Sequence, residues 1–212
     1  PQLIEADRNH YLMAINGTMR SKTLGLAFTD VSTGEFEVCE FRFDELMRFY
    51  DFVSLLQPRE ILLAQSRSEP ETQFLEELTK RILQLVSLGN SSESNENLEQ
   101  LFNFLDPYQF DFDSAEKRLK THFRTLNLTG FGIEGMPHAI ASAGALLRYL
   151  EDTQKCNLVH FNTIRRHRFE ESMLLDESSV VNLELFDNQS GQRQYTLYAV
   201  VNRTLTPMGG RL

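Results

Sequence analysis

Cysteine is scarce in this chain, and its two cysteines form no recognisable pattern. Cys39 and Cys156 lie more than a hundred positions apart among 212 residues, with no C-x-x-C pair and no histidine at ligand spacing. A zinc site or a disulfide framework needs several such ligands at characteristic spacings. We therefore expect neither, and a reducing, cytoplasmic setting fits best.

Long apolar runs and phosphate-binding loops are also missing. Charged residues interrupt every apolar stretch within about eight residues, whereas a membrane-spanning helix needs roughly 20, and no signal peptide is recognisable. No glycine is followed by lysine, so the chain contains no G-x-x-x-x-G-K-[ST] motif. We expect no membrane segment and no P-loop nucleotide hydrolysis within these residues.

Negative charge is confined to the first half. Residues 1–110 carry 9 Lys and Arg against 18 Asp and Glu, a balance of -9, whereas residues 111–212 carry 12 of each. An acidic surface repels phosphate, so the first half is a poor platform for duplex DNA, although excess carboxylate also simply favours solubility.

The first half reads as an α/β domain. Alternating apolar residues predict strands at Asn9–Asn16, Leu24–Thr29 and Glu35–Phe41, with a hairpin turn at Asp30–Gly34. We then predict a helix over Asp44–Gln57, with Asp44 as its N-cap, and a buried strand at Ile61–Ala64. A helix follows from Pro70 to Ile82, and after it a strand at Leu83–Leu88. The order βββαβαβ predicts an RNase H-like mixed sheet with flanking helices.

The second half is mostly helical. A polar loop over Gly89–Asn97 precedes helical periodicity at Leu98–Leu105, Ser114–Leu126 and Met136–Gln154, the last rich in small residues that permit close helix packing. Further on, we predict an extended stretch at Thr163–Leu175, a short helix capped by Asp176 that carries Val180 and Leu183, and a helix at Tyr195–Arg203. We place the domain boundary near residues 107–113, which gives domains at 1–110 and 111–212.

Two groups of residues resemble a dinucleotide-binding motif and a two-metal nuclease site, but neither has the structural context that such a site needs. Gly130, Gly132 and Gly135 match G-x-G-x-x-G, yet a helix precedes them instead of the strand that a dinucleotide site requires, so a joint between helices explains them better. Asp30, Glu35, Glu37 and Asp7 are candidate ligands of a two-metal nuclease. However, Asp30 belongs to a turn in which it is expected to bond its own backbone, and Glu35 and Glu37 alternate with apolar residues and should face water.

The histidines and the clustered basic residues are expected to lie on surfaces or interfaces. None of the five histidines, His10, His122, His138, His160 and His167, lies beside a nucleophile motif. Two basic groups could touch phosphate: Lys117, Arg118, Lys120 and Arg124 on one helix, and Arg165, Arg166 and Arg168. A solvated face or an interdomain salt-bridge surface is the alternative interpretation.

Several segments, in order and across the whole chain, resemble the bacterial MutS family of DNA mismatch-repair proteins. They are Leu3–Ala6, Asn9–Ile15, Gly25–Phe36, Leu128–Gly132, Ala143–Leu150, Thr153–Gln154, Met173–Asp176, Asn182–Leu185 and Arg203–Leu212. Val181 and Asn202 depart from the family, where Arg and Asp are usual, which puts only fine packing contacts in doubt.

The resemblance implies a non-catalytic part of such a protein. Residues 1–110 would be the RNase H-like connector domain and residues 111–212 the truncated start of the helical core and lever domain. The full-length protein, a cytoplasmic homodimer, would recognise mismatched DNA and use ATP and Mg²⁺ to signal to MutL. This part would link domains and offer a docking surface, with no catalytic, cofactor or metal residues and unknown DNA contacts. The alternatives are a divergent RNase H-like, metal-dependent nuclease and a generic interaction module. Apolar side chains around Tyr195–Val201 should be exposed.

Overall fold

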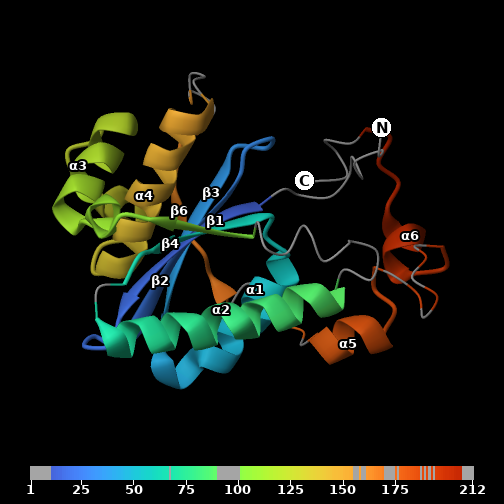
Figure 1. Ribbon diagram of the computed structural model, residues 1–212. Helices are drawn as coiled ribbons and strands as arrows, with labels where there is room; N and C mark the ends of the chain where they lie inside the picture. The colour runs from blue at the N-terminus through green and yellow to red at the C-terminus, as the bar shows by residue number, and fades with distance from the viewer. Residues whose placement is uncertain are drawn as a thin grey trace.

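A six-stranded mixed sheet organises the protein (Figure 1). The structure is a computed structural model and describes residues 11–66, 68–89, 101–154, 158, 161–169, 175, 177–186, 188, 190, 192 and 194–206. The strands are β1 (Tyr11–Thr18), β2 (Thr23–Asp30), β3 (Glu35–Arg42), β4 (Glu60–Ala64), β5 (Phe102–Leu105) and β6 (Arg165–Arg166).

The strand order is β5-β4-β1-β2-β3-β6. β1, β2 and β3 form an antiparallel meander, while β4 and β5 run parallel to β1 and β6 runs parallel to β3. The turn between β2 and β3 places Gly34 at φ 77°, the positive value expected of glycine there. The predicted RNase H-like α/β sheet is confirmed.

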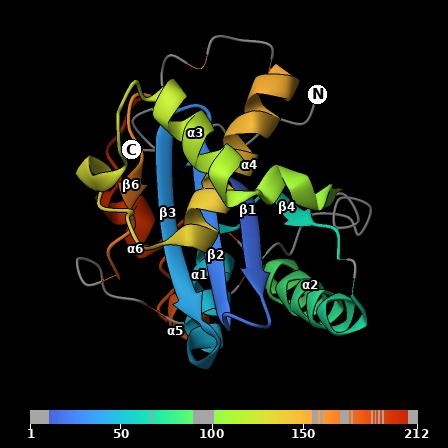
Figure 2. The same ribbon diagram turned by 90° about the vertical axis from the view of Figure 1, so that its left-hand side faces the viewer.

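Helices cover both faces of the sheet. α1 (Leu46–Leu56) and α2 (Glu69–Gly89) lie on one face, and α3 (Phe112–His122) and α4 (Pro137–Gln154) lie on the other (Figures 1 and 2). Because side chains alternate along a strand, Ile61 and Leu63 of β4 pack toward α1 and α2, while Leu62 packs toward α4. This explains the continuous apolar run that the sequence predicted to be a strand buried on both faces.

Two of the predicted elements were wrong. Leu83–Leu88 is not a strand but the continuation of α2, since Leu78, Ile82 and Val86 keep the four-residue period of a buried helix stripe. The remaining parallel strand is β5, within Leu98–Leu105, where a helix was predicted. Four residues are too few for a period to be recognised, and pairing with β4 decides their conformation.

The start of α1 also differs from the prediction. A 3-10 turn at Phe43–Glu45 comes first, and α1 begins at Leu46 with Glu45 as its N-cap and no side-chain cap bond. Asp44, predicted as the N-cap, instead pairs with the guanidinium of Arg42 at 2.8 Å.

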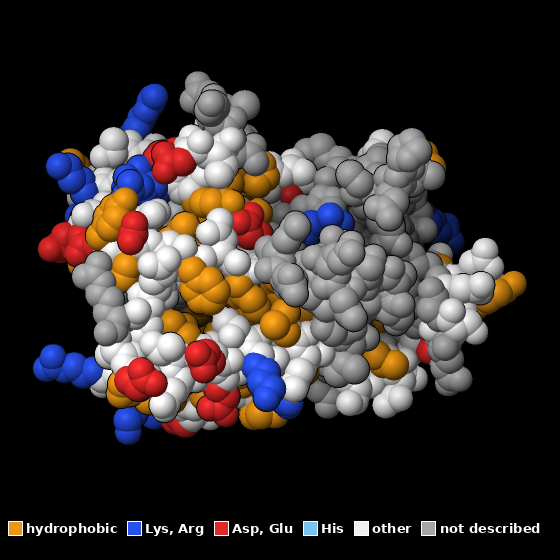
Figure 3. Space-filling view, in the orientation of Figure 1, with side chains coloured by type: hydrophobic (Ala, Val, Ile, Leu, Met, Phe, Trp, Pro, Cys, Tyr) orange, Lys and Arg blue, Asp and Glu red, His pale blue; other side chains and the backbone are white. Residues whose placement is uncertain are grey.

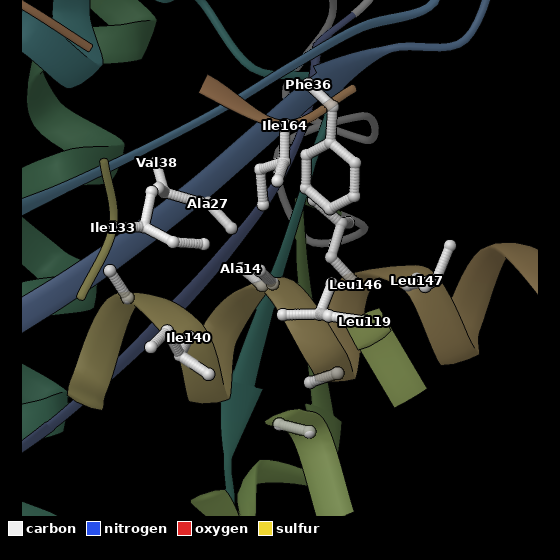
Figure 4. Close-up of a cluster of buried hydrophobic side chains, with 14 of the residues drawn as sticks. Ala14, Ala27, Phe36, Val38, Leu119, Ile133, Ile140, Leu146, Leu147 and Ile164 are labelled. Atoms are coloured by element: carbon white, nitrogen blue, oxygen red, sulfur yellow. The ribbon is translucent and has the colours of Figure 1, made fainter. Parts of the chain in front are cut away.

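α4 packs unusually closely on its neighbours. A Cβ atom on Gly25 of β2 would lie 2.0 Å from the carbonyl carbon of His138, and one on Gly144 would lie 2.2 Å from the Cβ of Ala115 in α3. Close helix packing through small residues is thereby confirmed. In Figure 4, Leu146 of α4 points toward Phe36 of β3, while Ile140 lies on the side of α4 away from the labelled strand residues. Phe110, within the boundary predicted near residues 107–113, belongs to the same buried cluster as residues of α3 and α4.

The C-terminal part is less compact. Of the predicted extended stretch Thr163–Leu175, the described residues form only the short strand β6, and 170–174 lie outside the description. The two predicted short helices are α5 (Glu177–Asn182) and α6 (Leu197–Val201), capped by Thr196, while the predicted cap Asp176 lies outside the described residues. Tyr195 is 90% exposed and Val200 69%, so the expected apolar exposure is confirmed.

Replacing Gly25 by Ala should destabilise the fold, because the added methyl group would overlap the backbone of α4. We expect a loss of about 1–3 kcal/mol in the free energy of unfolding, measured by urea titration followed by circular dichroism. Gly130→Ala is the control, since its Cβ would meet nothing within 4 Å. Equal midpoints for the two variants would refute the close approach.

Candidate functional site

The acidic residues at the β2–β3 end of the sheet are engaged in local structure. Asp30 is fully buried, and its Oδ1 accepts hydrogen bonds from the backbone N–H of Ser32 at 2.7 Å and from the Ser32 hydroxyl at 2.6 Å. The predicted Asp turn is confirmed. Among the described residues, no group of three or more His, Cys, Asp or Glu is arranged to hold a metal ion, and Asp7 lies outside them.

Glu35 and Glu37 were predicted to face water, and this prediction was wrong. Both are half-buried, because β6 and the residues after it cover the outer edge of β3. Glu35 accepts a hydrogen bond from the Tyr11 hydroxyl at 3.0 Å, and burial is the main cause that raises the pKa of its carboxyl group. Glu37 lies 2.6 Å from Nδ1 of His167.

The residues around β6, here called the exit segment (161–169), are fastened to both faces of the sheet. Phe161 and Ile164 are buried on the α4 face. The backbone N–H of His167 donates to the carbonyl of Val38 at 2.8 Å. The imidazole ring of His167 packs against the aromatic rings of Phe28, Phe52 and Phe169 on the α1 face. The chain therefore leaves the sheet through a well-anchored segment.

The glycine motif lies in a joint between helices, as predicted. Gly130 is in the 3-10 turn Thr129–Phe131, which follows α3, and Gly132 and Gly135 take positive φ before α4 begins. An anion site would need free N–H groups at the start of α4. Those of His138 and Ala139 already donate to Oε1 of Glu40, at 2.8 and 3.0 Å.

Glu40 was missed as a structural residue by the sequence analysis. It caps α4 from the neighbouring strand β3, nearly a hundred residues earlier in the chain. A carboxylate favours a helix N-terminus, whose exposed N–H groups carry partial positive charge. The available signal was its register, since Glu40 continues the core-facing alternation of Phe36 and Val38.

Two further polar contacts hold α4 to the sheet. The Ser142 hydroxyl donates to the carbonyl of Gly25 at 2.9 Å. Nearer the other end, the Tyr149 hydroxyl donates to Oε1 of Glu60 at 2.6 Å, and burial together with this carboxylate raises the pKa of Tyr149 to about 12. We call the contacts of Glu40, Ser142 and Tyr149 the α4 clamp.

The histidines serve as contacts, and the basic residues are only partly paired. His122 Nε2 lies 3.0 Å from the carbonyl oxygen of Phe161, His138 is half-buried at the start of α4, and His10 and His160 lie outside the described residues. On α3, Arg118 pairs with Glu151 of α4, and Lys120 pairs with Glu116 at 2.9 Å. Arg165 and Arg166 are exposed on β6.

Comparisons with known proteins agree on one family. A family model described as MutS domain II matches residues 10–162. A "DNA mismatch repair protein MutS" of Dehalococcoides mccartyi strain CBDB1 is 34% identical over 213 residues, which cover 100% of this chain and 22% of that protein. Proteins of the same name from Protochlamydia amoebophila and Chlorobaculum tepidum are each 34% identical, over 99% and 100% of this chain and 22% of their own length. The chain thus spans 22% of the length of these curated relatives. No helix among the described residues is both long and apolar enough to cross a membrane.

Removing the Glu40 carboxylate should weaken the seating of α4. In Glu40→Ala, two N–H groups at a partly buried helix start lose their acceptor, which should cost about 1–2 kcal/mol of unfolding free energy. Glu76→Ala on the exposed side of α2 is the matched control and should change stability by about 0.5 kcal/mol or less. Thermal unfolding followed by circular dichroism measures both, and an unchanged melting temperature for Glu40→Ala would contradict the capping role.

Proposed function

Because this chain belongs to the MutS family of DNA mismatch-repair proteins and contains its domain II, we propose that it is the connector that joins the moving parts of such a protein. In this role it carries out no chemistry itself. The whole protein would recognise mismatched DNA and use ATP and Mg²⁺ bound by other domains.

The observation that best supports a linking role is the attachment of both α4 and the exit segment to the sheet. The α4 clamp fixes α4 to β2, β3 and β4 through buried or half-buried hydrogen bonds. The exit segment then fastens the next part of the chain to β3. A body that transmits displacement must resist internal deformation, and closely packed interiors do so.

The α3–α4 layer also bears on where the connector ends. α3 and α4 share one hydrophobic cluster with β1, β2, β3 and β4. We propose that the connector continues through the exit segment, to about residue 169, and that the lever begins with α5. This places the boundary later than residue 110.

The partners follow from this role. We propose that other domains of the same protein pack on exposed apolar side chains of α5, of α6 and of the residue that follows α5, namely Val181, Leu197, Val200, Val201 and Leu183. We further propose docking of a MutL-type protein on the connector, contact with mismatched DNA only through the whole, homodimeric protein, and a cytoplasmic location.

Replacing His167 by Ala should loosen the exit segment without unfolding the sheet. The change removes the contact with Glu37 and the packing against three aromatic rings. We expect amide hydrogen exchange in residues 161–169 to quicken by about tenfold, equivalent to about 1.4 kcal/mol of local stability. Arg165→Ala, an exposed change in the same segment, is the control. If both variants exchange like the parent chain, the anchoring role fails.

Binding assays with the purified chain test the proposed function directly. We expect a MutL-type protein from the same organism to bind the immobilised chain in biolayer interferometry. Gel shifts should reveal no preference for a mismatched over a matched duplex, and ATP should not be hydrolysed. Tight, selective heteroduplex binding by the chain alone would contradict the proposal, as would the absence of any MutL-type binding.

A further inference from the structure

The two edges of the sheet differ in how they are protected. At one edge, β6 has only two residues, Arg165 and Arg166, and both are exposed. At the other edge, β5 has the sequence Phe-Asn-Phe-Leu, with neither a charged residue nor a proline. Natural sheets usually protect an edge strand by shortness, charge or proline, because its unpaired backbone groups otherwise attract another strand. By this standard β6 is a protected edge and β5 is an open one.

The backbone of β5 has hydrogen-bonding groups that the fold leaves unused. The carbonyl of Leu101 accepts from the N–H of Ile61 at 2.7 Å, and that of Leu105 accepts from the residue after β4 at 2.9 Å. In a parallel pair, only every second residue bonds to the neighbouring strand. The N–H and carbonyl groups of Phe102 and Phe104 therefore point outward, and within the described part of the chain they bond to nothing.

Exposed aromatic side chains flank this edge on both faces of the sheet. Phe104 is 47% exposed and shares the α2 face with Phe102. On the α4 face, Tyr108 in the turn after β5 is 55% exposed, and the guanidinium of Arg148 lies 5.1 Å from the centroid of its ring. Figure 1 shows β5 in front of the other strands, between α2 and α4, and Figure 3 shows apolar side chains near the centre of the same side. Aromatic and Arg side chains are enriched at the centres of protein interfaces.

The hydrogen-bonding pattern of this edge selects its ligand. Outward N–H and carbonyl groups that recur at every second residue are matched by an extended peptide backbone, whereas a helix uses these groups internally. The charge is unsuited to phosphate, since β5 has no cation and Arg148 already pairs with Asp152 at 3.7 Å. The size excludes a second copy, because an edge of four residues, about 13 Å long, cannot by itself bury the roughly 1,200–2,000 Å² of a stable dimer. A short, uncharged, extended segment fits all three conditions.

We propose that the outer edge of β5 binds a short, uncharged, extended segment of a partner protein, which adds to the sheet as a further strand. Its backbone pairs with the N–H and carbonyl groups of Phe102 and Phe104. Neighbouring side chains of the segment lie on opposite faces of the sheet, so that one packs on Phe104 and the next on Tyr108. This inference goes beyond the proposed function, because it defines the ligand by its backbone conformation and does not require a MutL-type protein.

The test uses the full chain and fluorescence anisotropy with three labelled forms of one short peptide of alternating Val and Thr. The first form is unmodified, the second is N-methylated at every second residue, and the third is N-methylated throughout. The second form keeps one edge able to pair and cannot assemble into fibrils, so we expect it to bind as tightly as the first, with little dependence on salt. The third form has no N–H to donate and should bind about tenfold or more weakly. Equal binding of the second and third forms overturns the proposal.

Two substitutions of Phe104 separate its backbone from its side chain. Phe104→Pro removes an outward N–H, which an edge strand tolerates, and should weaken binding of the second peptide by about tenfold or more. Phe104→Ala keeps that N–H and should weaken it by about threefold or less, through lost packing alone. Met47→Ala, at another exposed apolar side chain, is the control and should leave the affinity unchanged. Equal affinities for the Pro and Ala variants, with both folded by circular dichroism, contradict pairing at this edge.

Amide hydrogen exchange locates the contact in the unaltered chain, so the test does not depend on the folding of any variant. The N–H groups of Phe102 and Phe104 should exchange quickly in the free chain and about tenfold or more slowly when the second peptide saturates it. Peptide binding without this protection would place the ligand elsewhere and overturn the proposal. Sedimentation of the free chain checks the other occupant: a dimer that Phe104→Pro abolishes would replace the partner segment by a second copy and refute it.

Discussion

The close approach of α4 to the sheet is the constraint on which the rest of the structure depends. Gly25 and Gly144 have no side chain, so α4 can lie directly against β2 and α3. At that distance its first N–H groups reach Glu40 on β3, and the Ser142 hydroxyl reaches the carbonyl of Gly25. Van der Waals contact and hydrogen bonding thus support each other, because the bonds form only where the packing is tight.

Acidic residues near the sheet, some of which resemble metal ligands of a nuclease, make structural contacts in this fold. Asp30 completes a turn, Glu37 contacts His167, and Glu40 caps a helix. A carboxylate that already satisfies a buried partner is poorly placed to bind a metal ion as well, since the protein would lose the first interaction. Asp30 and Glu37, two of the acids that suggested a nuclease, are therefore part of the hydrogen bonding that holds the fold together.

Some exposed side chains have no role in the packing of the fold. The apolar side chains of α5 and α6 are exposed, and so is Leu126 beside Lys117 and Arg124. These surfaces differ in chemistry, since one is apolar and the other joins positive charge to a single apolar side chain.

The sequence by itself determined the meander β1–β3, the buried strand β4, the helices α1, α3 and α4, and the family, because strong periodicity and ordered sequence segments are local properties of a chain. It could not determine that α2 continues through Leu83–Leu88 or that Phe102–Leu105 forms β5, since pairing with β4 decides such a short segment. Tertiary structure alone decided the partners of Glu35, Glu37 and Glu40, because both faces and the β3 edge of the sheet are covered by segments distant in sequence. It also decided which cations of α3 remain unpaired, since that depends on the carboxylates that folding brings beside them.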